Sequence, residues 1–130
     1  MSPMIEISDR DILRSKLVQP GWYKVRIESC NESLSKAGDS TNFVMEATIL
    51  RNADTGKEDF AGVPTPYWNF NSKAPGFVVG FLLALGTDAK AGRYDLSKAV
   101  GKEIDVFIKN ELYEGRMVNK MNHEYRAPRS

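Results

Sequence analysis

The chain has 130 residues, 42% of them hydrophobic and 27% charged, which is the composition of one folded domain and excludes a disordered segment. Lysine and arginine number 18 against 17 acidic residues, so the net charge of +1 excludes a strongly basic tail and any electrostatic site must be local. Cys30, the single cysteine, forms no internal disulfide and residues 1–4 lack a signal-peptide pattern, so we expect a cytoplasmic protein.

A short helix and two strands are predicted in the first 50 residues. Ser8 is a favourable N-cap for a helix over Ser8–Leu17. The apolar period changes to two from Trp22 onward and again over Thr41–Leu50, which predicts two strands that each bury one face. The loop between them, Asn31–Ser40, is polar, and loops of this kind often carry function. The apolar stripe of the helix consists of Ile12, Leu13 and Leu17.

The third strand is predicted at an edge of the sheet, and a helix follows it. Pro64 and Pro66 interrupt the extended segment Phe60–Phe70, and proline cannot donate the ladder hydrogen bonds of a central strand. The apolar spacing over Pro75–Leu85 predicts a helix that ends at Gly86. The longest apolar run lies within this helix and is about half the length of a membrane span, so no membrane insertion is expected.

A helical turn, a hairpin and a tail are predicted in the last third of the chain. Asp95–Gly101 predicts the turn, the alternation from Ile104 predicts a strand, and Gly115 turns the chain into a partner strand. The chain therefore divides into an N-terminal helical arm (1–20), one β domain (21–122) and a C-terminal tail (123–130).

The order of these elements predicts the fold class. Three strands, a helix and a closing hairpin follow one another as they do in the OB fold, where the helix closes one end of the barrel. We therefore expect a mainly β protein, a five-stranded OB-fold-like barrel with a helix between strands 3 and 4 and a short N-terminal helix.

Six short motifs carry a resemblance to a known family. They are Gly21-Trp22-Tyr23-Lys24-Val25-Arg26-Ile27, Lys36-Ala37-Gly38, Tyr67-Trp68-Asn69-Phe70, Leu82-Leu83-Ala84-Leu85-Gly86, Gly101-Lys102-Glu103-Ile104 and Tyr113-Glu114-Gly115-Arg116. In this order they resemble a family of phage and prophage domains, long catalogued as of unknown function, that is similar to phage single-stranded DNA-binding proteins. The resemblance implies an OB-fold protein that coats or guards single strands during phage replication or recombination in the host cytoplasm.

The candidate DNA-binding residues combine cations with flat side chains. Sequence-tolerant binding of a single strand needs cations along the phosphates and rings on which bases stack. In an OB barrel, the first hairpin loop, strands 2 and 3 and the last hairpin border one groove, so residues far apart in the chain converge there. The candidates are Trp22, Lys24, Arg26, Lys36, Tyr67, Trp68, Phe70, Lys73, Tyr113, Arg116 and Lys120.

The aromatic cluster of the third strand has two interpretations. Trp68 and Phe70 have the same parity, and such a pair belongs either to the core or to a stacking platform. If the pair is in the core, Tyr67 is the exposed ring. Trp22 could equally pack against the N-terminal helix, and Lys24 and Arg26 could simply be a solvated face.

Features of an enzyme are missing from the sequence. His123 and Cys30 are the only residues of their kinds and supply neither a four-ligand zinc site nor a nucleophile relay, and no phosphate-binding glycine motif occurs. Glu103 and Asp105 alternate on one strand, which is usually a solvated face rather than a metal site. We therefore expect no catalysis, no cofactor and no metal.

The expected partners follow from these interpretations. They are single-stranded DNA and phage replication or recombination proteins, with self-association through the edges of the third strand and the hairpin as a further contact. The alternative function is a protein-interaction or structural module of a phage replication complex or particle, because OB-like barrels also bind peptides and the net charge is near zero.

Overall fold

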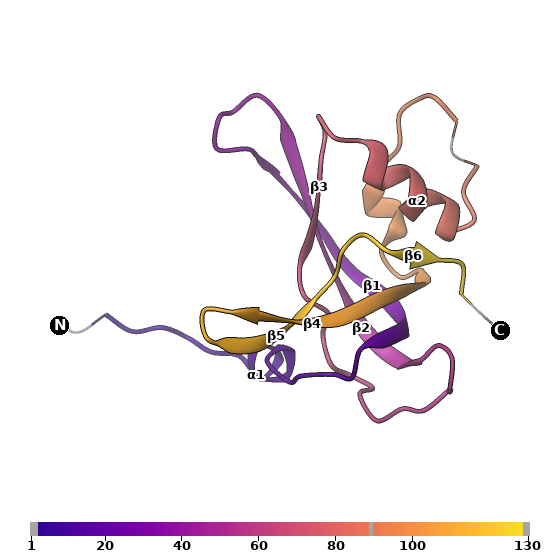
Figure 1. Cartoon of the computed structure of the whole chain (residues 1–130). Helices are drawn as coiled ribbons and strands as arrows, with labels where there is room; N and C mark the ends of the chain where they lie inside the picture. The colour runs from indigo at the N-terminus through magenta and orange to yellow at the C-terminus, as the bar shows by residue number, and fades with distance from the viewer. Residues whose placement is uncertain (1–2, 89, 129–130) are drawn as a thin grey trace.

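In the part of the chain that the structure describes, an antiparallel sheet of six strands carries the fold, with two small α-helices beside it (Figure 1). The structure is a computed structural model and describes residues 3–88 and 90–128. Its elements are α1 (Asp9–Arg14), β1 (Gly21–Leu34), β2 (Thr41–Asn52), β3 (Trp68–Asn71), α2 (Gly76–Ala84), the 3₁₀ helix η1 (Leu96–Ala99), β4 (Glu103–Tyr113), β5 (Arg116–Lys120) and β6 (Tyr125–Arg126). The mainly β class and the positions of both helices agree with the prediction.

The sheet does not close into a barrel, which corrects the expected architecture. Its strand order is β3-β2-β1-β4-β5, with β6 attached to β4. Within the described ranges, β3 and β5 form the two ends of this path and no ladder joins them. Pro64 and Pro66 have no backbone N–H to donate, so the segment before β3 is joined to β2 by separate backbone hydrogen bonds, such as that from Thr65 N–H to Ala47 O at 2.8 Å, and the continuous ladder of β3 has four residues.

One long strand holds the two halves of the sheet together. β1 pairs with β2 along nearly its whole length, and its first six residues, Gly21 to Arg26, also pair with β4. The β1–β2 register shifts at Lys24/Val25 and again at Ile27/Ser29. Because an extra residue in one strand bends and twists the pair, these two irregularities turn the far part of the β1–β2 hairpin away from β4.

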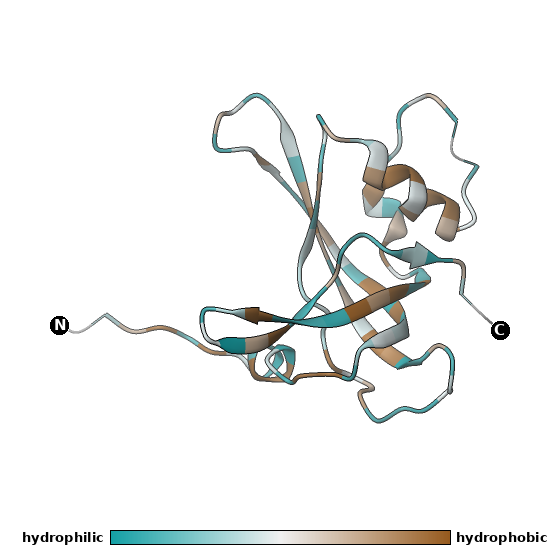
Figure 2. Ribbon diagram, viewed as in Figure 1, coloured by the Kyte–Doolittle hydropathy of each residue, from teal (hydrophilic) through white to brown (hydrophobic). Residues whose placement is uncertain are grey.

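The period-two alternation produces the core as predicted. Tyr23, Val25 and Ile27 point inward from β1, and Met45, Ala47 and Ile49 do so from β2. Phe81 of α2 covers them, and alternate residues of β4 complete the cluster. Figure 2 shows α2 as a largely hydrophobic helix, in contrast to the more polar ends of the hairpins. No helix among the described residues is long and apolar enough to cross a membrane.

Helix α1 docks through charges and not through its apolar stripe. Arg10 and Arg14 both pair with Glu46, a carboxylate that is almost fully buried on β2. Ile12 and Leu13 remain exposed, as does Leu17 just after the helix, so the apolar stripe does not dock the helix on the sheet. A buried carboxylate is costly unless cations compensate for it, and the two guanidinium groups supply that compensation. Ser8 caps the helix as predicted.

The predicted tail contributes to the folded domain. Tyr125 and Arg126 form β6, which pairs with Val106 and Asp105 of β4. The Tyr125 ring packs against Phe81 at 5.3 Å between centroids. The interpretation of 123–130 as a tail alone is therefore wrong, and its cause is that a two-residue strand gives no periodic signal.

Candidate nucleic-acid interface

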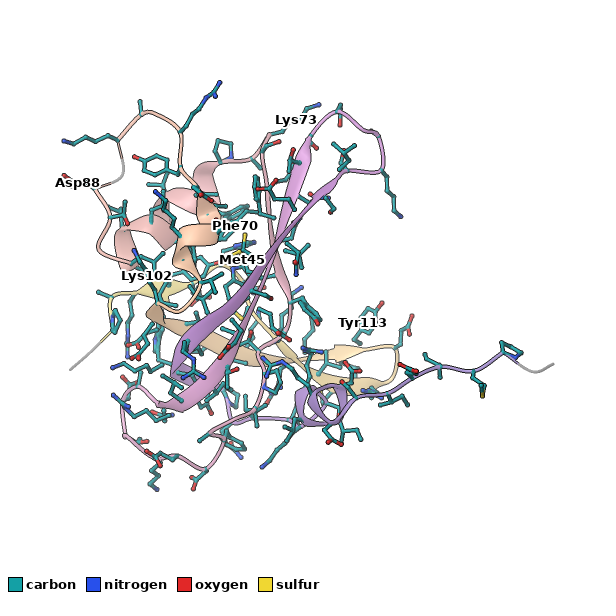
Figure 3. The ribbon with its side chains drawn as sticks, turned by 180° about the vertical axis from the view of Figure 1, so that it is seen from behind. Met45, Phe70, Lys73, Asp88, Lys102 and Tyr113 are labelled. Carbon is teal, nitrogen blue, oxygen red and sulfur yellow. The ribbon has the colours of Figure 1, made fainter. Side chains whose placement is uncertain are left out.

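The aromatic cluster predicted as a stacking platform divides between two faces of the sheet. Trp68 pairs in register with Met45, and Phe70 with Phe43, so both rings point inward and are only 5% and 1% exposed. Figure 3 shows Phe70 close to Met45 in the interior. Neither ring can stack on a base. The prediction of Trp68 and Phe70 as DNA-binding residues is therefore wrong. Tyr67, of opposite parity, remains 56% exposed.

Tyr67 lies beneath a guanidinium group. The central carbon of the Arg14 guanidinium is 4.2 Å from the centre of the Tyr67 ring, a cation–π contact. Arg14 also pairs with Asp11 at 3.2 Å and with Glu46, so three contacts fix its side chain. The pKa of Asp11 is lowered by its hydrogen bonds to Ser8 and by the charge of Arg14.

A pocket of about 420 Å³ opens beside Tyr67, between α1 and β5. Arg116 of the β4–β5 hairpin forms part of its wall, and Arg14 forms another part. The complete lining is Asp11, Arg14, Ser15, Pro66, Tyr67, Arg116, Val118 and Asn119. One predicted ring and one predicted cation, 49 residues apart in sequence, are thus brought together as expected.

The β4–β5 hairpin presents three predicted residues on one face. Tyr113 pairs with Arg116 in register and Lys109 with Lys120, and these pairs alternate with pairs on the opposite face. Because Arg116 borders the Tyr67 pocket, this face is turned toward Tyr67. Tyr113 is 60% exposed, and Figure 3 shows it standing out from the end of the hairpin.

Side-chain amides line the sheet between the two hairpins. Asn69 and Asn71 have the same outward parity as Tyr67, and both donate to the Asn42 amide oxygen, at 3.1 and 2.8 Å. Asn71 also donates to Ser40 at 3.0 Å. This face is polar but uncharged, so it does not repel phosphates and offers donors and acceptors to base edges or sugars.

The first strand's predicted cations are already neutralised. Lys24 has a side chain only 10% exposed and pairs with Glu103 at 3.6 Å, while Arg26 pairs with Glu28 at 2.9 Å. The register explains the first pair, since acidic residues of β4 lie opposite the cations of β1. The prediction of Lys24 as a DNA-binding residue is therefore wrong, because its buried ammonium group cannot contact phosphates.

Trp22 also belongs to this neutralised face. Its ring packs edge-on against Phe107 at 5.5 Å, and the Arg126 guanidinium lies 4.4 Å from the ring centre. Arg126 itself pairs with Asp105 and Asp54. Trp22 is thus used in packing between β1, β4 and β6, and the structure does not bring it to the Tyr67 pocket.

Lys36 and Lys73 lie near the far end of the first hairpin. Lys73 follows β3 and forms an ion pair with Asp39 of the hairpin loop, which lowers the pKa of that carboxyl. Lys36 is exposed in the same loop. Of the predicted cations, Lys36, Arg116 and Lys120 make no ion pair within residues 3–88 and 90–128, so these three remain available to an anionic ligand.

Three features of this surface were missed from the sequence. Arg14 is not among the predicted residues, although Arg10 and Arg14 have the i, i+4 spacing that indicates a charged helix face. Asn69 and Asn71 alternate in the sequence with the buried rings of Trp68 and Phe70. This alternation indicates that the two asparagines lie on the outward face of the strand. Among the described residues, no three histidine, cysteine or acidic side chains gather as a metal site would require.

No protein-family model matches this chain, and no curated protein matches it at a significant level. The interpretation of the surface accordingly depends on its residues and their geometry.

Proposed function

We propose that this chain is a phage-type, OB-like protein that binds single-stranded DNA without strong sequence preference and acts in replication or recombination. The strand would lie between the β1–β2 and β4–β5 hairpins, across the amide-lined face of β2 and β3. The observation that supports this most is the convergence of two exposed tyrosines, Tyr67 and Tyr113, with the unpaired Arg116.

Each component of this surface suits one part of an unpaired strand. The two tyrosine rings offer faces for stacking, and base–aromatic stacking contributes about 1–3 kcal/mol per base. Arg116, Lys120 and Lys36 offer charges to phosphates, and Arg14 holds the Tyr67 ring in place. Each side-chain amide of Asn42, Asn69 and Asn71 has one oxygen that accepts hydrogen bonds and one NH2 group that donates them. Such groups can bond to any base and favour no single one.

Duplex DNA suits the surface less well. The described elements include no helix that projects from the body with a basic face, as major-groove readers require, because α1 spans six residues and is held on Glu46. A base that remains paired and stacked in a duplex cannot stack on the exposed tyrosine rings. We therefore assign the surface to single strands.

A fluorescence-anisotropy titration with labelled oligo-dT tests the proposal. The wild type should bind oligo-dT far more tightly than a duplex of equal length, and binding should weaken as salt is added. Tyr67→Ala and Tyr113→Ala should each weaken binding by about fivefold or more, as loss of a stacked base predicts. Leu83→Ala is the matched control, because Leu83 is an apolar side chain of α2 with an exposed fraction of 57%, close to those of Tyr67 and Tyr113, and lies outside the proposed interface. Equal affinity for duplex, or equal losses in all three variants, would contradict the proposal.

A further inference from the structure

A second surface of the molecule is largely apolar. A groove of about 580 Å³ runs between α2 and the segment that precedes η1. Val78, Val79 and Leu82 line one side, and Phe43 of β2 lies at its base. Tyr94 and Leu96 line the other side. The segment before η1 lies on the far side of α2 from the β4–β5 hairpin (Figure 1), and the groove shares Asn71, at the end of β3, with the proposed DNA interface.

The N-terminal arm has the complementary character. Residues 3–7 precede α1 without regular structure, and within them Met4, Ile5 and Ile7 are 94%, 85% and 66% exposed. Isolated apolar side chains on a surface are ordinary, but three in one extended segment of five residues are costly to keep in water. An extended backbone places Ile5 and Ile7 on one side and Glu6 on the other.

The arm cannot fill the groove of its own chain. Figure 1 shows residues 3–7 extending away from the body on the side opposite α2 and the segment before η1. Arm and groove therefore lie at opposite ends of the molecule, and α1 is fixed between them by its ion pairs with Glu46. Any groove that this arm reaches belongs to another molecule.

Charge selects a second copy of this chain as the occupant. The groove carries Lys90 and Arg93 at its edge, and Arg93 makes no ion pair in the described part of the chain. Lys90 pairs only loosely with Asp88, at 3.8 Å between two highly exposed side chains. When Ile5 and Ile7 enter the groove, Glu6 on the opposite side of the arm stays at its edge, where the long side chains of Lys90 and Arg93 carry the opposite charge.

We propose that the arm of one copy, Met4 to Ile7, docks in the groove beside α2 of the next copy. Such a contact joins two different surfaces, so it is head-to-tail and generates an open chain of molecules instead of a closed dimer. This inference goes beyond the proposed function and does not depend on it. If single-strand binding is also correct, the same contact makes that binding cooperative along the strand.

Sedimentation velocity of the full chain without nucleic acid tests the arm. The wild type should form larger species as concentration rises. Ile5→Asp combined with Ile7→Asp should weaken association by about 100-fold or more, because two isoleucine side chains no longer leave water. The matched control is Leu34→Asp combined with Leu112→Asp, which removes two equally exposed leucines from the hairpins and should leave association unchanged. A wild type that stays monomeric, or equal losses in both double variants, overturns the proposal.

A charge exchange tests the pairing of arm and groove. Glu6→Arg and Arg93→Glu should each weaken self-association by about fivefold, the upper range for one exposed ion pair. A mixture of the two variants should associate as the wild type does, because each arm then meets a groove of opposite charge. Glu58→Arg, a change at an exposed acid in the β2–β3 connection, is the control and should have no effect. Failure of the mixture to associate overturns the assignment of the groove.

Discussion

Lys109 and Lys120 lie directly opposite each other in the register of the β4–β5 hairpin, so two like charges occupy one face of a two-stranded ribbon. Like charges in this position destabilise a hairpin, by about 0.2–1 kcal/mol for a cross-strand pair. An anionic ligand on the same face removes that repulsion. Under the proposed function, the lysine pair would be unfavourable in the free protein and stabilised by phosphates in the bound state.

The first prediction concerns this pair. Lys120→Glu should raise the free energy of unfolding by about 0.5 kcal/mol, because it replaces a repulsive pair by an attractive one. The same change should weaken oligo-dT binding, which loses a cation and gains an acid. Thermal unfolding and anisotropy of one preparation measure both effects. Lys98→Glu, on η1, is the control and should leave DNA affinity unchanged. A variant that loses both stability and affinity would contradict this account.

The second prediction separates the available cations from the neutralised ones. Arg116→Ala should reduce the slope of log affinity against log salt by about 0.7, the value for one phosphate contact on a single strand. Arg26→Ala should leave the slope unchanged, because Arg26 is paired with Glu28 on the face shared with β4. Titrations at several salt concentrations give both slopes. The opposite result would return the interface to the first strand.

The third prediction contrasts two neighbouring rings of the aromatic cluster. Phe70→Ala should lower the free energy of unfolding by about 3–5 kcal/mol, because it leaves a cavity in the core beside Phe81. Tyr67→Ala should lower it by less than about 1 kcal/mol, since the exposed ring loses mainly its contact with Arg14. Urea denaturation provides the comparison. Similar costs at the two positions would show that Tyr67 is structural.

The fourth prediction concerns pH. His123 stacks on Phe77 at 4.3 Å between ring centres and hydrogen-bonds the Tyr125 hydroxyl at 2.9 Å. Burial, together with the positive charge of Lys120, lowers the pKa of His123 in the folded state. The unfolded chain, with a histidine pKa of about 6.5, then binds the proton more readily than the folded one. Stability should therefore be complete above about pH 6.5 and decline as the pH falls toward the lowered folded-state pKa.

Thermal unfolding between pH 7.5 and 5 measures this decline. His123→Asn is the informative variant, because asparagine tolerates the positive φ of 57° at this position and does not titrate. Its melting temperature should change less over this range than that of the wild type. Parallel curves for the two proteins would assign the pH dependence to other groups.

The parts of the fold that a periodic pattern specifies were predictable from the sequence. Alternation identified the inward faces of β1 and β2, and the prolines before Trp68 identified an edge strand. Closure of the barrel was not predictable, because it depends on whether β3 and β5 meet, and no local pattern encodes a contact between strands so far apart. The two-residue strand β6 is likewise too short to show a period.

The structure leaves some of the predicted site residues exposed and shows that others are buried or neutralised. Tyr67, Tyr113 and Arg116 could be proposed because exposed rings and cations in these segments suggest a shared groove. The prediction for Trp68 was wrong because the sequence does not tell which face of β3 points toward the core. The register with β2 decides it. The prediction for Lys24 was wrong because its ion-pair partner Glu103 belongs to β4, about 80 residues later in the chain. The sequence alone does not place β4 beside β1.

The two register shifts of β1 determine a dimension of the molecule that no ligand contact reveals. Since one continuous strand supports both hairpins, the opening between them depends on how sharply β1 curves between Lys24 and Ser29. A single strand bound as proposed would then meet an opening whose width the backbone of β1 sets. Under the proposed function, a deletion that removed one irregularity would change the number of nucleotides covered per molecule while leaving Tyr67, Tyr113 and Arg116 in the sequence.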